Sequence, residues 1–357
     1  MQTRAETPGT SESADDVDLT LTDEQADMVA SFAGLLAKES SPERVRAAEP
    51  IGFDAALWRM LLDTGALTMA VPERQGGWGA SLIDLVLVAE QLGRALAPAP
   101  AVEAQVAARL LGAIGSEPAL QALKTVLAGD QLIALALRPS GSGAMPLVPA
   151  GAICDAVVVP DSDRLVLVSV ESQGRRPVAN LAAAPLADLT SDVGNATELA
   201  RGPEAVDQFE VAIDEWLLLT AAALVGAGAA AHDLACAYAA ERRAFGGIIG
   251  GYQGVAHPLA DDATAIDGAR LLTWKAAWAL DNSLDRSREL AAMAFAFASE
   301  ASSRATYDAI HFHGGYGFML EHDVQLHYRR VRGWARVWGD AEAAYQRAAA
   351  ARYGRAP

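Results

Sequence analysis

The residues best suited to bind a ligand lie in the segment 241–253, which reads ERRAFGGIIGGYQ. Arg242 and Phe245 are three positions apart, so an α-helix would place them on one face near its C-terminal end. The glycine pair 246–247 can end that helix, because glycine adopts the left-handed cap conformation without a steric penalty. Gln253 then opens the next amphipathic segment. A guanidinium, an aromatic ring and an amide at one corner suit a ligand with a phosphate and a flat ring.

The same residues could instead form an interface in which Arg242 pairs with a carboxylate, and the segment alone does not separate a ligand site from such an interface.

A second cluster invites a metal-binding interpretation, because four of the six histidines fall close together, at His311, His313, His322 and His327. No cysteine joins them, and the last two are five positions apart, off a shared helical face. A turn or interface role is therefore the prediction, and no metal is expected.

The chain is acidic, with a formal net charge of −17, which argues against nucleic acid or an anionic membrane surface as its main partner. A basic run stands out within it, formed by Arg329, Arg330, Arg332 and Arg336. A phosphate would suit this run. Pairing with the acidic helices of the C-terminal part is the favoured prediction.

Other features predict a soluble, cytoplasmic protein. Cys154 and Cys236 show no metal or redox spacing, which is typical of the reducing cytosol. Residues 1–17 are polar and acidic, so they predict a disordered tail rather than a signal peptide. Residues 216–231 carry no charge, but they fall short of the roughly 20 residues needed to cross a bilayer. They predict a buried helix instead. No Ser/His/Asp triad, P-loop or Rossmann fingerprint is present in the sequence.

The elements that position these residues divide the chain into three parts. Helical periodicity, beginning at the cap-like Thr22, predicts helices at 22–39, 54–65, 82–96, 103–114 and 118–127. Short β-branched runs then predict strands at 132–137, 152–160, 164–170 and 208–213. Long helices follow at 214–243, 255–281, 285–312 and 320–352, with a break at Gly339.

The expected fold is therefore mainly α with a small β domain. After the tail at 1–17, we expect an N-terminal helical domain at 18–127, a middle β-barrel-like domain at 128–213 and a C-terminal four-helix bundle at 214–357. The corner at 241–253 then joins the first two helices of the bundle.

Three stretches of the chain resemble the acyl-CoA dehydrogenase family. They are LWRMLLDTGALTMAVPERQGGWGASLIDLVLVAEQLGRALAPAP (57–100), YAAERRAFGGIIGGYQGVAHPLAD (238–261) and HFHGGYGFMLEHDVQLHYRRVR (311–332). The three stretches occur in the order expected for the family, which makes the resemblance specific. The resemblance covers nearly the whole chain except the tail. It is weakest in the β domain. It implies a flavoprotein fold whose helical bundle forms tetramers.

The resemblance also implies that FAD lies between subunits. The bundle of one chain would contact the pyrophosphate and adenine side of a neighbour's FAD, and a glycine turn would let its backbone approach the same dinucleotide. The matching positions are Arg242, Phe245, Gln253, Gly314 and Gly315, together with His311 where the family usually has glutamine.

The family reaction removes two hydrogens across Cα–Cβ of an acyl thioester, with a glutamate taking the α-proton and a hydride passing to the flavin. Family members carry that glutamate before the last helix or early in the first bundle helix. Before the last helix, this chain reads Trp338-Gly339-Asp340 where the family reads aromatic–Glu–Gly. On the bundle helix the position falls on Trp216, and the adjacent Glu215 would point about 100° away. Glu215 and Asp340 remain the only candidates for a base, and neither matches the family pattern.

The middle domain departs from the family as well. Members that hold their own flavin carry a Thr-Glu-Pro-x-Ala-Gly-Ser-Asp-like loop, followed by a strand with tryptophan. The counterpart here, ALRPSGSGAMPLVPAG (136–151), has neither an acidic residue nor a tryptophan. This combination resembles the non-catalytic subunit of actinobacterial heterotetrameric (α2β2) steroid-type acyl-CoA dehydrogenases. It implies FAD shared with a homologous catalytic subunit, which carries the glutamate and binds the acyl-CoA, a steroid side-chain ester.

Two alternatives stay open. The chain could be a self-sufficient homomeric acyl-CoA dehydrogenase with Glu215 or Asp340 as base. It could also be a helical scaffold without flavin, although the retained Arg242, Phe245, Gln253 and glycine turn speak against that.

Overall fold

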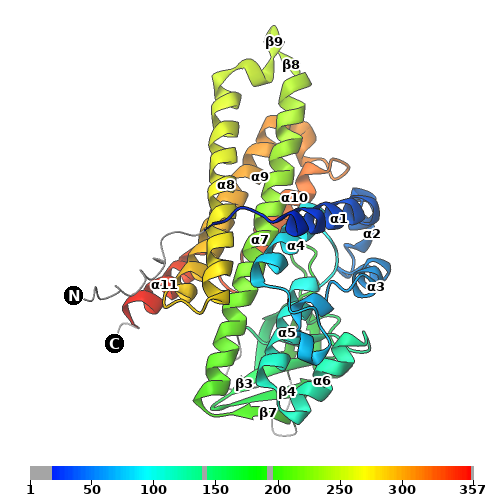
Figure 1. The fold of residues 1–357 in the computed structure, drawn as a ribbon. Coiled ribbons are helices and arrows are strands. Elements are labelled where there is room, and N and C mark those ends of the chain that lie inside the picture. The colour runs from blue at the N-terminus through cyan, green and yellow to red at the C-terminus, as the bar shows by residue number, and fades with distance from the viewer. Residues whose placement is uncertain (1–17, 139–142, 191–195, 355–357) are drawn as a thin grey trace, which may run out of the picture.

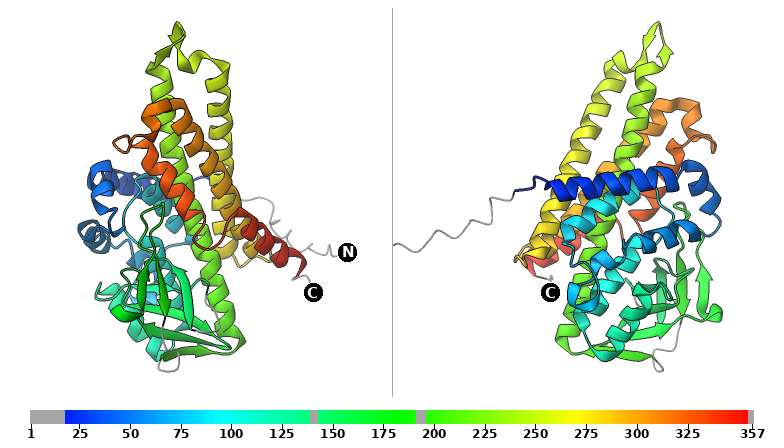
Figure 2. Two further views of the ribbon diagram at one scale, coloured as in Figure 1. Left: turned by 180° about the vertical axis from the view of Figure 1, so that it is seen from behind. Right: turned by 45° about the vertical axis from the view of Figure 1, so that its right-hand side comes forward.

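The computed structural model describes residues 18–138, 143–190 and 196–354. The predicted tail at 1–17 and part of the 136–151 loop lie outside these residues. Within them, an N-terminal group of helices packs beside a small β region, and a long helical bundle extends away from both (Figures 1 and 2). The predicted fold class, mainly α with a small β domain, is confirmed.

The N-terminal helices begin where the sequence places polar caps. They are α1 (Asp23–Glu39), α2 (Pro42–Ala48), α3 (Ala55–Asp63), α4 (Leu82–Arg94), α5 (Ala101–Ile114) and α6 (Glu117–Leu127), with 3-10 turns η1 (Thr68–Ala70) and η2 (Glu73–Gln75). The side chains of Thr22 and Ser81 form capping boxes at α1 and α4. The sequence prediction missed α2, which is a short helix capped by Ser41 with Pro42 in its first turn.

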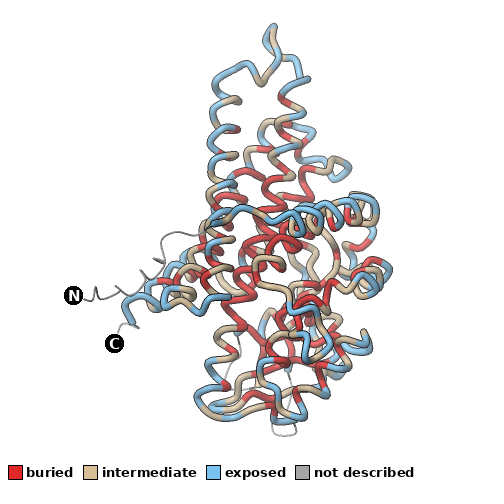
Figure 3. The backbone as a smooth tube through the Cα atoms, in the orientation of Figure 1, coloured by how far each residue is buried: buried red, intermediate tan, exposed pale blue. Residues whose placement is uncertain are grey.

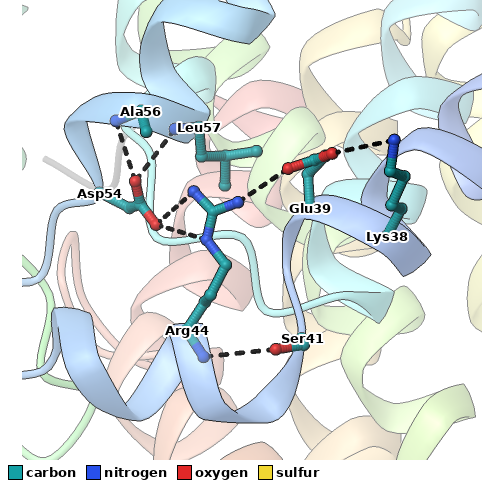
Figure 4. A network of polar contacts seen from close by, with 7 residues as sticks. All are labelled: Lys38, Glu39, Ser41, Arg44, Asp54, Ala56 and Leu57. Carbon is teal, nitrogen blue, oxygen red and sulfur yellow. Dashed lines mark hydrogen bonds and ion pairs between the residues drawn. The ribbon is translucent and has the colours of Figure 1, made fainter.

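A single arginine ties the first three helices together (Figure 4). The Arg44 guanidinium donates to Asp54 Oδ2 at 3.0 and 2.8 Å and to Glu39 Oε2 at 2.9 Å. The other oxygen of Asp54 accepts the backbone N–H groups of Ala56 and Leu57, at 2.9 and 3.0 Å. Asp54 therefore caps α3 and anchors α2 at the same time.

The β region consists of two small sheets among the described residues. One has the order β1-β3-β4-β7 and the other β2-β6-β5, and only the β1–β3 pair is parallel. The strands are β1 (Ile133–Leu135), β2 (Ala144–Val148), β3 (Ala156–Asp161), β4 (Arg164–Ser169), β5 (Arg175–Pro177), β6 (Ala187–Thr190) and β7 (Thr197–Arg201), with the turn η3 (Ser172–Gly174) before β5. Sequence patterns missed β2, β5, β6 and β7, which lack the β-branched runs of the strands that were predicted.

The predicted strand at 208–213 is wrong, and with it the start of the first bundle helix at 214. These residues belong to α7 (Pro203–Glu241). Phe209, Ala212 and Ile213 are buried at helical spacing, i, i+3 and i+4, and Pro203 occupies the first position of the helix.

The bundle is built around α7 and continues through α8 (Gln253–Asp281), α9 (Ser287–His313), α10 (Val324–Trp334) and α11 (Ala341–Tyr353). The predicted break at Gly339 falls in the segment 335–340, which separates α10 from α11. Short elements join the long helices at the far end of the bundle: the hairpin β8 (Arg243–Ala244) and β9 (Gly247–Ile248), then η5 (Ile249–Gly251), and η6 (Gly314–Phe318) after α9.

Helix α7 is long and apolar enough to cross a membrane by length and composition, but 94% of its most apolar window is buried inside the protein. Figure 3 shows this burial along most of the helix, in contrast to the exposed hairpin end. Small residues allow the close packing: a Cβ on Gly93 of α4 would lie 2.0 Å from the Ala223 carbonyl oxygen, and one on Gly226 would lie 2.0 Å from that of Glu90. Helix α7 is therefore a core helix, consistent with a soluble protein.

Candidate functional site

The corner at 241–253 is a β-hairpin rather than a helical cap. Helix α7 ends at Glu241, Arg242 is extended, and Arg243 and Ala244 pair with Ile248 and Gly247. Phe245 stands at the tip with a φ of 53° and 96% of its surface exposed. The prediction that Arg242 and Phe245 share a helical face is therefore wrong, because the chain leaves the helix before both residues.

The hairpin is held by the side chain that follows it. The Tyr252 hydroxyl donates to the carbonyl oxygens of Ala244 and Phe245, at 3.1 and 2.9 Å. These bonds occupy the carbonyl groups of the turn and support the left-handed conformation of Phe245, which is unusual for a bulky residue. The hairpin therefore presents the Phe245 ring outward in a defined position.

Arg242 lies in the wall of an open surface pocket of about 550 Å³. The same pocket is lined by Gly314 and Gly315, which begin η6 and follow Arg242 by 72 and 73 positions in the chain. Arg242 is exposed, and no salt bridge reaches it from the residues that the structure describes. The structure thus brings together a free guanidinium and a glycine turn, as the sequence predicted.

The two glycines of this turn are not needed by the packing of the chain itself. A Cβ on Gly314 or on Gly315 would meet no atom within 4 Å, and only Gly314 has a positive φ, of 62°. Gly317 of the same turn is different, since its Cβ would lie 2.5 Å from the Ile310 carbonyl oxygen. The open space at Gly314 and Gly315 leaves room for a group from outside the chain to approach the backbone.

The sequence pattern did not identify Tyr238 as a pocket residue, and it predicted only a turn or interface role for His313. Tyr238 and His313 stack with ring centroids 4.4 Å apart, and His313 also lies against His322 at 4.7 Å. His313 Nδ1 donates to the Ala309 carbonyl at 2.7 Å. Burial lowers the pKa of His313, so its neutral ring offers Nε2 as an acceptor. Tyr238 lies four positions before Arg242, a helical spacing that would have pointed to it.

The other predicted binding residues lie at the same end of the bundle but outside this pocket. Gln253 is exposed at the first position of α8. His311 is exposed in the last turn of α9, where its ring is nearly parallel to that of Tyr307, at 6.4 Å. No group of three or more His, Cys, Asp or Glu side chains in the described part of the chain could hold a metal ion.

The basic run does not pair with acidic helices of the bundle, so that prediction is corrected. Arg329 and Arg330 reach Glu49, at the end of α2, at 2.9 and 3.3 Å. Arg332 lies over the Tyr328 ring, and Arg336 donates to the Arg332 carbonyl oxygen. The first two arginines therefore join α10, which packs against α7 and α9, to the end of α2.

The two candidates for a catalytic base have structural partners. Glu215 accepts two hydrogen bonds from the Arg109 guanidinium, at 3.0 and 2.9 Å, and only 6% of its surface is exposed. Its neighbour Trp216 lines a different cavity, as the 100° step around a helix requires. Asp340 caps α11 by accepting the Ala343 N–H at 3.0 Å.

Gly339, which stands where the family has its loop glutamate, is close to the next helix. A Cβ at this position would lie 2.9 Å from the Cβ of Ala343, closer than real Cβ contacts. The loop in this conformation has no room for a larger side chain at that position.

Comparisons with known proteins decide the family. The family model "Acyl-CoA dehydrogenase, N-terminal domain" matches residues 22–129, and "Acyl-CoA dehydrogenase, C-terminal domain" matches residues 212–352. The chain is also 32% identical over 316 residues to "Acyl-CoA dehydrogenase IpdE2" of Mycolicibacterium smegmatis, covering 87% of this chain and 92% of that protein. The chain belongs to the acyl-CoA dehydrogenase family.

Two solved structures of steroid-type and heteromeric members share this fold. The ChsE4-ChsE5 complex from Mycobacterium tuberculosis matches with a TM-score of 0.84 and 25% identity, covering 96% of this chain and 100% of that chain. The Tcur3481-Tcur3483 steroid ACAD G363A variant matches with a TM-score of 0.84 and 25% identity, covering 92% and 97%.

FAD is the cofactor of this family, and the residues of the hairpin pocket fit a part of it. A free guanidinium suits a pyrophosphate, and the glycine turn leaves the backbone open to close approach. The equivalent of the family's own flavin-binding loop falls partly on residues 139–142, outside the described residues. The hairpin pocket lies at the end of the bundle that faces away from the β region (Figure 1).

Proposed function

We propose that this chain is the non-catalytic subunit of a heteromeric acyl-CoA dehydrogenase. In this role Arg242, Gly314 and Gly315 contact FAD that is held mainly by a homologous catalytic subunit. The observation that carries the proposal is the hairpin pocket, in which a free guanidinium lies beside a glycine turn with open space. Phe245, His311 and Gln253 are exposed at the same end of the bundle, outside the pocket, and we assign them to the same contact surface. When bound, FAD would accept a hydride from Cβ of an acyl-CoA thioester.

The positions of the carboxylates support the assignment of the base to the partner. Glu215 is engaged by the half-buried Arg109, Asp340 caps a helix, and a Cβ on Gly339 would lie 2.9 Å from the Cβ of Ala343. Because Arg109 already binds both oxygens of Glu215, this carboxylate is not free to approach an acyl thioester. We therefore assign the removal of the α-proton to a glutamate of the partner subunit.

The similarity of this chain to solved structures of two-component acyl-CoA dehydrogenases supports the proposed heteromeric assembly. The matched structures include a ChsE4-ChsE5 complex and a steroid dehydrogenase of two named components. We propose an α2β2 assembly, acting in the cytoplasm on a CoA ester of steroid side-chain type. The two unpaired cysteines, Cys154 and Cys236, are consistent with a reducing compartment.

Expression of the full chain alone and together with a homologous subunit tests this proposal. We expect a colourless, inactive chain alone, and a complex with about one FAD per two chains that oxidises acyl-CoA. Replacing the partner's glutamate should then abolish activity without loss of flavin. Yellow, active protein from this chain alone would instead establish the self-sufficient homomer.

A further inference from the structure

The segment 319–323 continues the wall of the hairpin pocket from η6 to the start of α10. Met319 lines the pocket together with Gly314 and Gly315. The apolar side chains here are largely exposed: 77% of Phe318, 48% of Met319 and 67% of Leu320 is accessible to solvent. Burial of apolar side chains therefore contributes little to the position of this segment within the chain, and its polar contacts become important.

Arg46 of α2 supplies such contacts from the other end of the sequence. Its Nε donates to the Leu320 carbonyl oxygen at 3.3 Å, and its Nη2 donates to the Glu321 carbonyl oxygen at 2.9 Å. The same Nη2 pairs with Asp323 Oδ1 at 2.6 Å. One planar guanidinium thus holds two consecutive carbonyl groups and the carboxylate just before α10.

Helix α2 is a firm support for Arg46. Arg44 ties it to α1 and α3 (Figure 4), and the side chain of Val45 is buried. Glu49, directly after the helix, pairs with Arg329 and Arg330 of α10 at 2.9 and 3.3 Å. The short helix is therefore attached to the N-terminal helices on one side and to α10 on the other, with Arg46 between these attachments.

The Leu320 carbonyl is a point at which two helices converge. Gln325 of α10 donates to it from Nε2 at 3.1 Å, in addition to Arg46. Arg329 in turn donates to Gln325 Oε1 at 3.1 Å. Leu320 and Glu321 are exposed residues, so water could also satisfy their carbonyl groups. The contribution of these contacts is therefore the position of the segment, rather than the rescue of buried polar groups.

We propose that Arg46 is a positioning residue for the flavin site that this chain shares with its partner. By holding the carbonyl groups of Leu320 and Glu321, it keeps Met319 and the glycine turn in the conformation that admits the cofactor. The inference rests on the proposed function, because it concerns the same pocket. A wall that is held in place before the cofactor arrives lowers the ordering cost of binding.

Titration of the apo complex with FAD tests this role. Arg46→Met should weaken FAD binding about three- to tenfold, since the pocket wall must then be ordered on binding. At saturating FAD, kcat should stay within about twofold of the wild type, because Arg46 lies outside the pocket and does not touch the reacting atoms.

Arg44→Met is the matched control, because Arg44 lies on the same short helix but its guanidinium faces α1 and α3. We expect this variant to lower the melting temperature of the complex while FAD affinity stays within about twofold of the wild type. Equal losses of FAD affinity in Arg44→Met and Arg46→Met would overturn the proposal, since they would show a general loosening of α2.

Hydrogen exchange in the full chain alone provides a measurement that needs neither FAD nor the partner. The amides of Met319 and His322 donate to the carbonyl oxygens of Tyr316 and Met319, both at 3.1 Å. Their exchange should become about three- to tenfold faster in Arg46→Met and stay unchanged in Arg44→Met. Unchanged exchange of both amides in Arg46→Met would contradict the positioning role.

Gly315→Ala separates failure of this inference from failure of the proposed function. If Gly315→Ala weakens FAD binding and Arg46→Met does not, Arg46 does not position the pocket, while the shared flavin site stands. If neither variant weakens FAD binding, the cofactor does not approach the glycine turn, and both the inference and the shared site are wrong.

Discussion

Arg109 holds Glu215 through two parallel hydrogen bonds, at 3.0 and 2.9 Å, between α5 and the buried face of α7. This fork-to-fork geometry fixes the orientation of Glu215. The carboxylate that lies nearest to a family base position therefore serves the junction between two regions of the chain.

Glu215→Gln should consequently lower stability without lowering catalysis. The substitution leaves Arg109 without a charged partner, which we expect to cost about 1–3 kcal/mol in urea unfolding. The kcat of the complex should stay within about twofold of the wild type, a change of less than 0.5 kcal/mol. The double variant Arg109→Met/Glu215→Leu should recover stability by packing without charge. A stable Glu215→Gln complex with a hundredfold lower kcat would identify Glu215 as the base.

Asp340 offers a pair of variants that separates capping from catalysis. Asparagine caps a helix about as well as aspartate, so Asp340→Asn should keep both stability and activity. Asp340→Ala should lose about 1 kcal/mol of stability, because the Ala343 N–H loses its acceptor. Thermal unfolding and acyl-CoA oxidation measure the two effects. Loss of activity in the asparagine variant would show that the carboxylate takes part in the reaction.

Arg242→Ala should reduce the FAD content of the complex, since a charge-assisted contact to phosphate is worth roughly 1.5–3 kcal/mol. This corresponds to about 10–100-fold weaker flavin binding, measured by fluorescence titration of the apo complex. Arg243→Ala is the matched control, because Arg243 is exposed in the same hairpin but does not line the pocket. If Arg242→Ala and Arg243→Ala bind FAD equally tightly, Arg242 does not contact the cofactor.

Two glycines of the turn at 314–317, Gly315 and Gly317, separate an effect on FAD binding from an effect on stability. Gly315→Ala should leave the fold of the chain unchanged, because the added Cβ meets no atom within 4 Å, yet it should weaken FAD binding. Gly317→Ala should instead destabilise the chain by about 1–3 kcal/mol, because its Cβ would lie 2.5 Å from the Ile310 carbonyl oxygen. Circular dichroism melting and flavin titration together distinguish the two effects. If Gly315→Ala binds FAD as tightly as the wild type, the cofactor does not approach the glycine turn.

Asp262 should make the bundle less stable as the pH rises. Burial, followed by the charge of Asp308, raises the pKa of Asp262 to about 7. The folded chain therefore holds this proton more tightly than the unfolded chain, whose aspartate pKa is about 3.9, so stability falls between about pH 4 and pH 7. Asp262→Asn should remove this loss and raise stability at pH 8 by up to about 4 kcal/mol, with little gain at pH 4.

The control for this prediction is Asp261→Asn, because Asp261 is exposed and shares the Arg304 partner. It should change stability by less than about 0.5 kcal/mol at either pH. Equal stability of wild type and Asp262→Asn at pH 8 would mean that Asp262 is not desolvated in the assembled protein.

Local sequence signals predicted most of the helices correctly. Caps such as Thr22 and Ser81 and apolar spacing act within a few residues, so they can be recognised without the fold. The family stretches likewise identified the fold, the cofactor and the pairing of Arg242 with the glycine turn. Weak local signals failed where tertiary context dominates, as in the helical segment 208–213, whose buried face is decided by packing against other helices.

Only the tertiary structure decided what several polar side chains do. Arg109 and Glu215 are 106 positions apart, and Glu103 and Trp216 are 113 apart, so no local pattern links them. Whether a carboxyl group is paired with a cation, caps a helix or faces an apolar cavity depends on the desolvation and the charges around it. The amino-acid sequence by itself determined the family and the residues available for chemistry. The packing of α5 against α7 determined which of those acids is bound by an arginine and which is left beside a cavity.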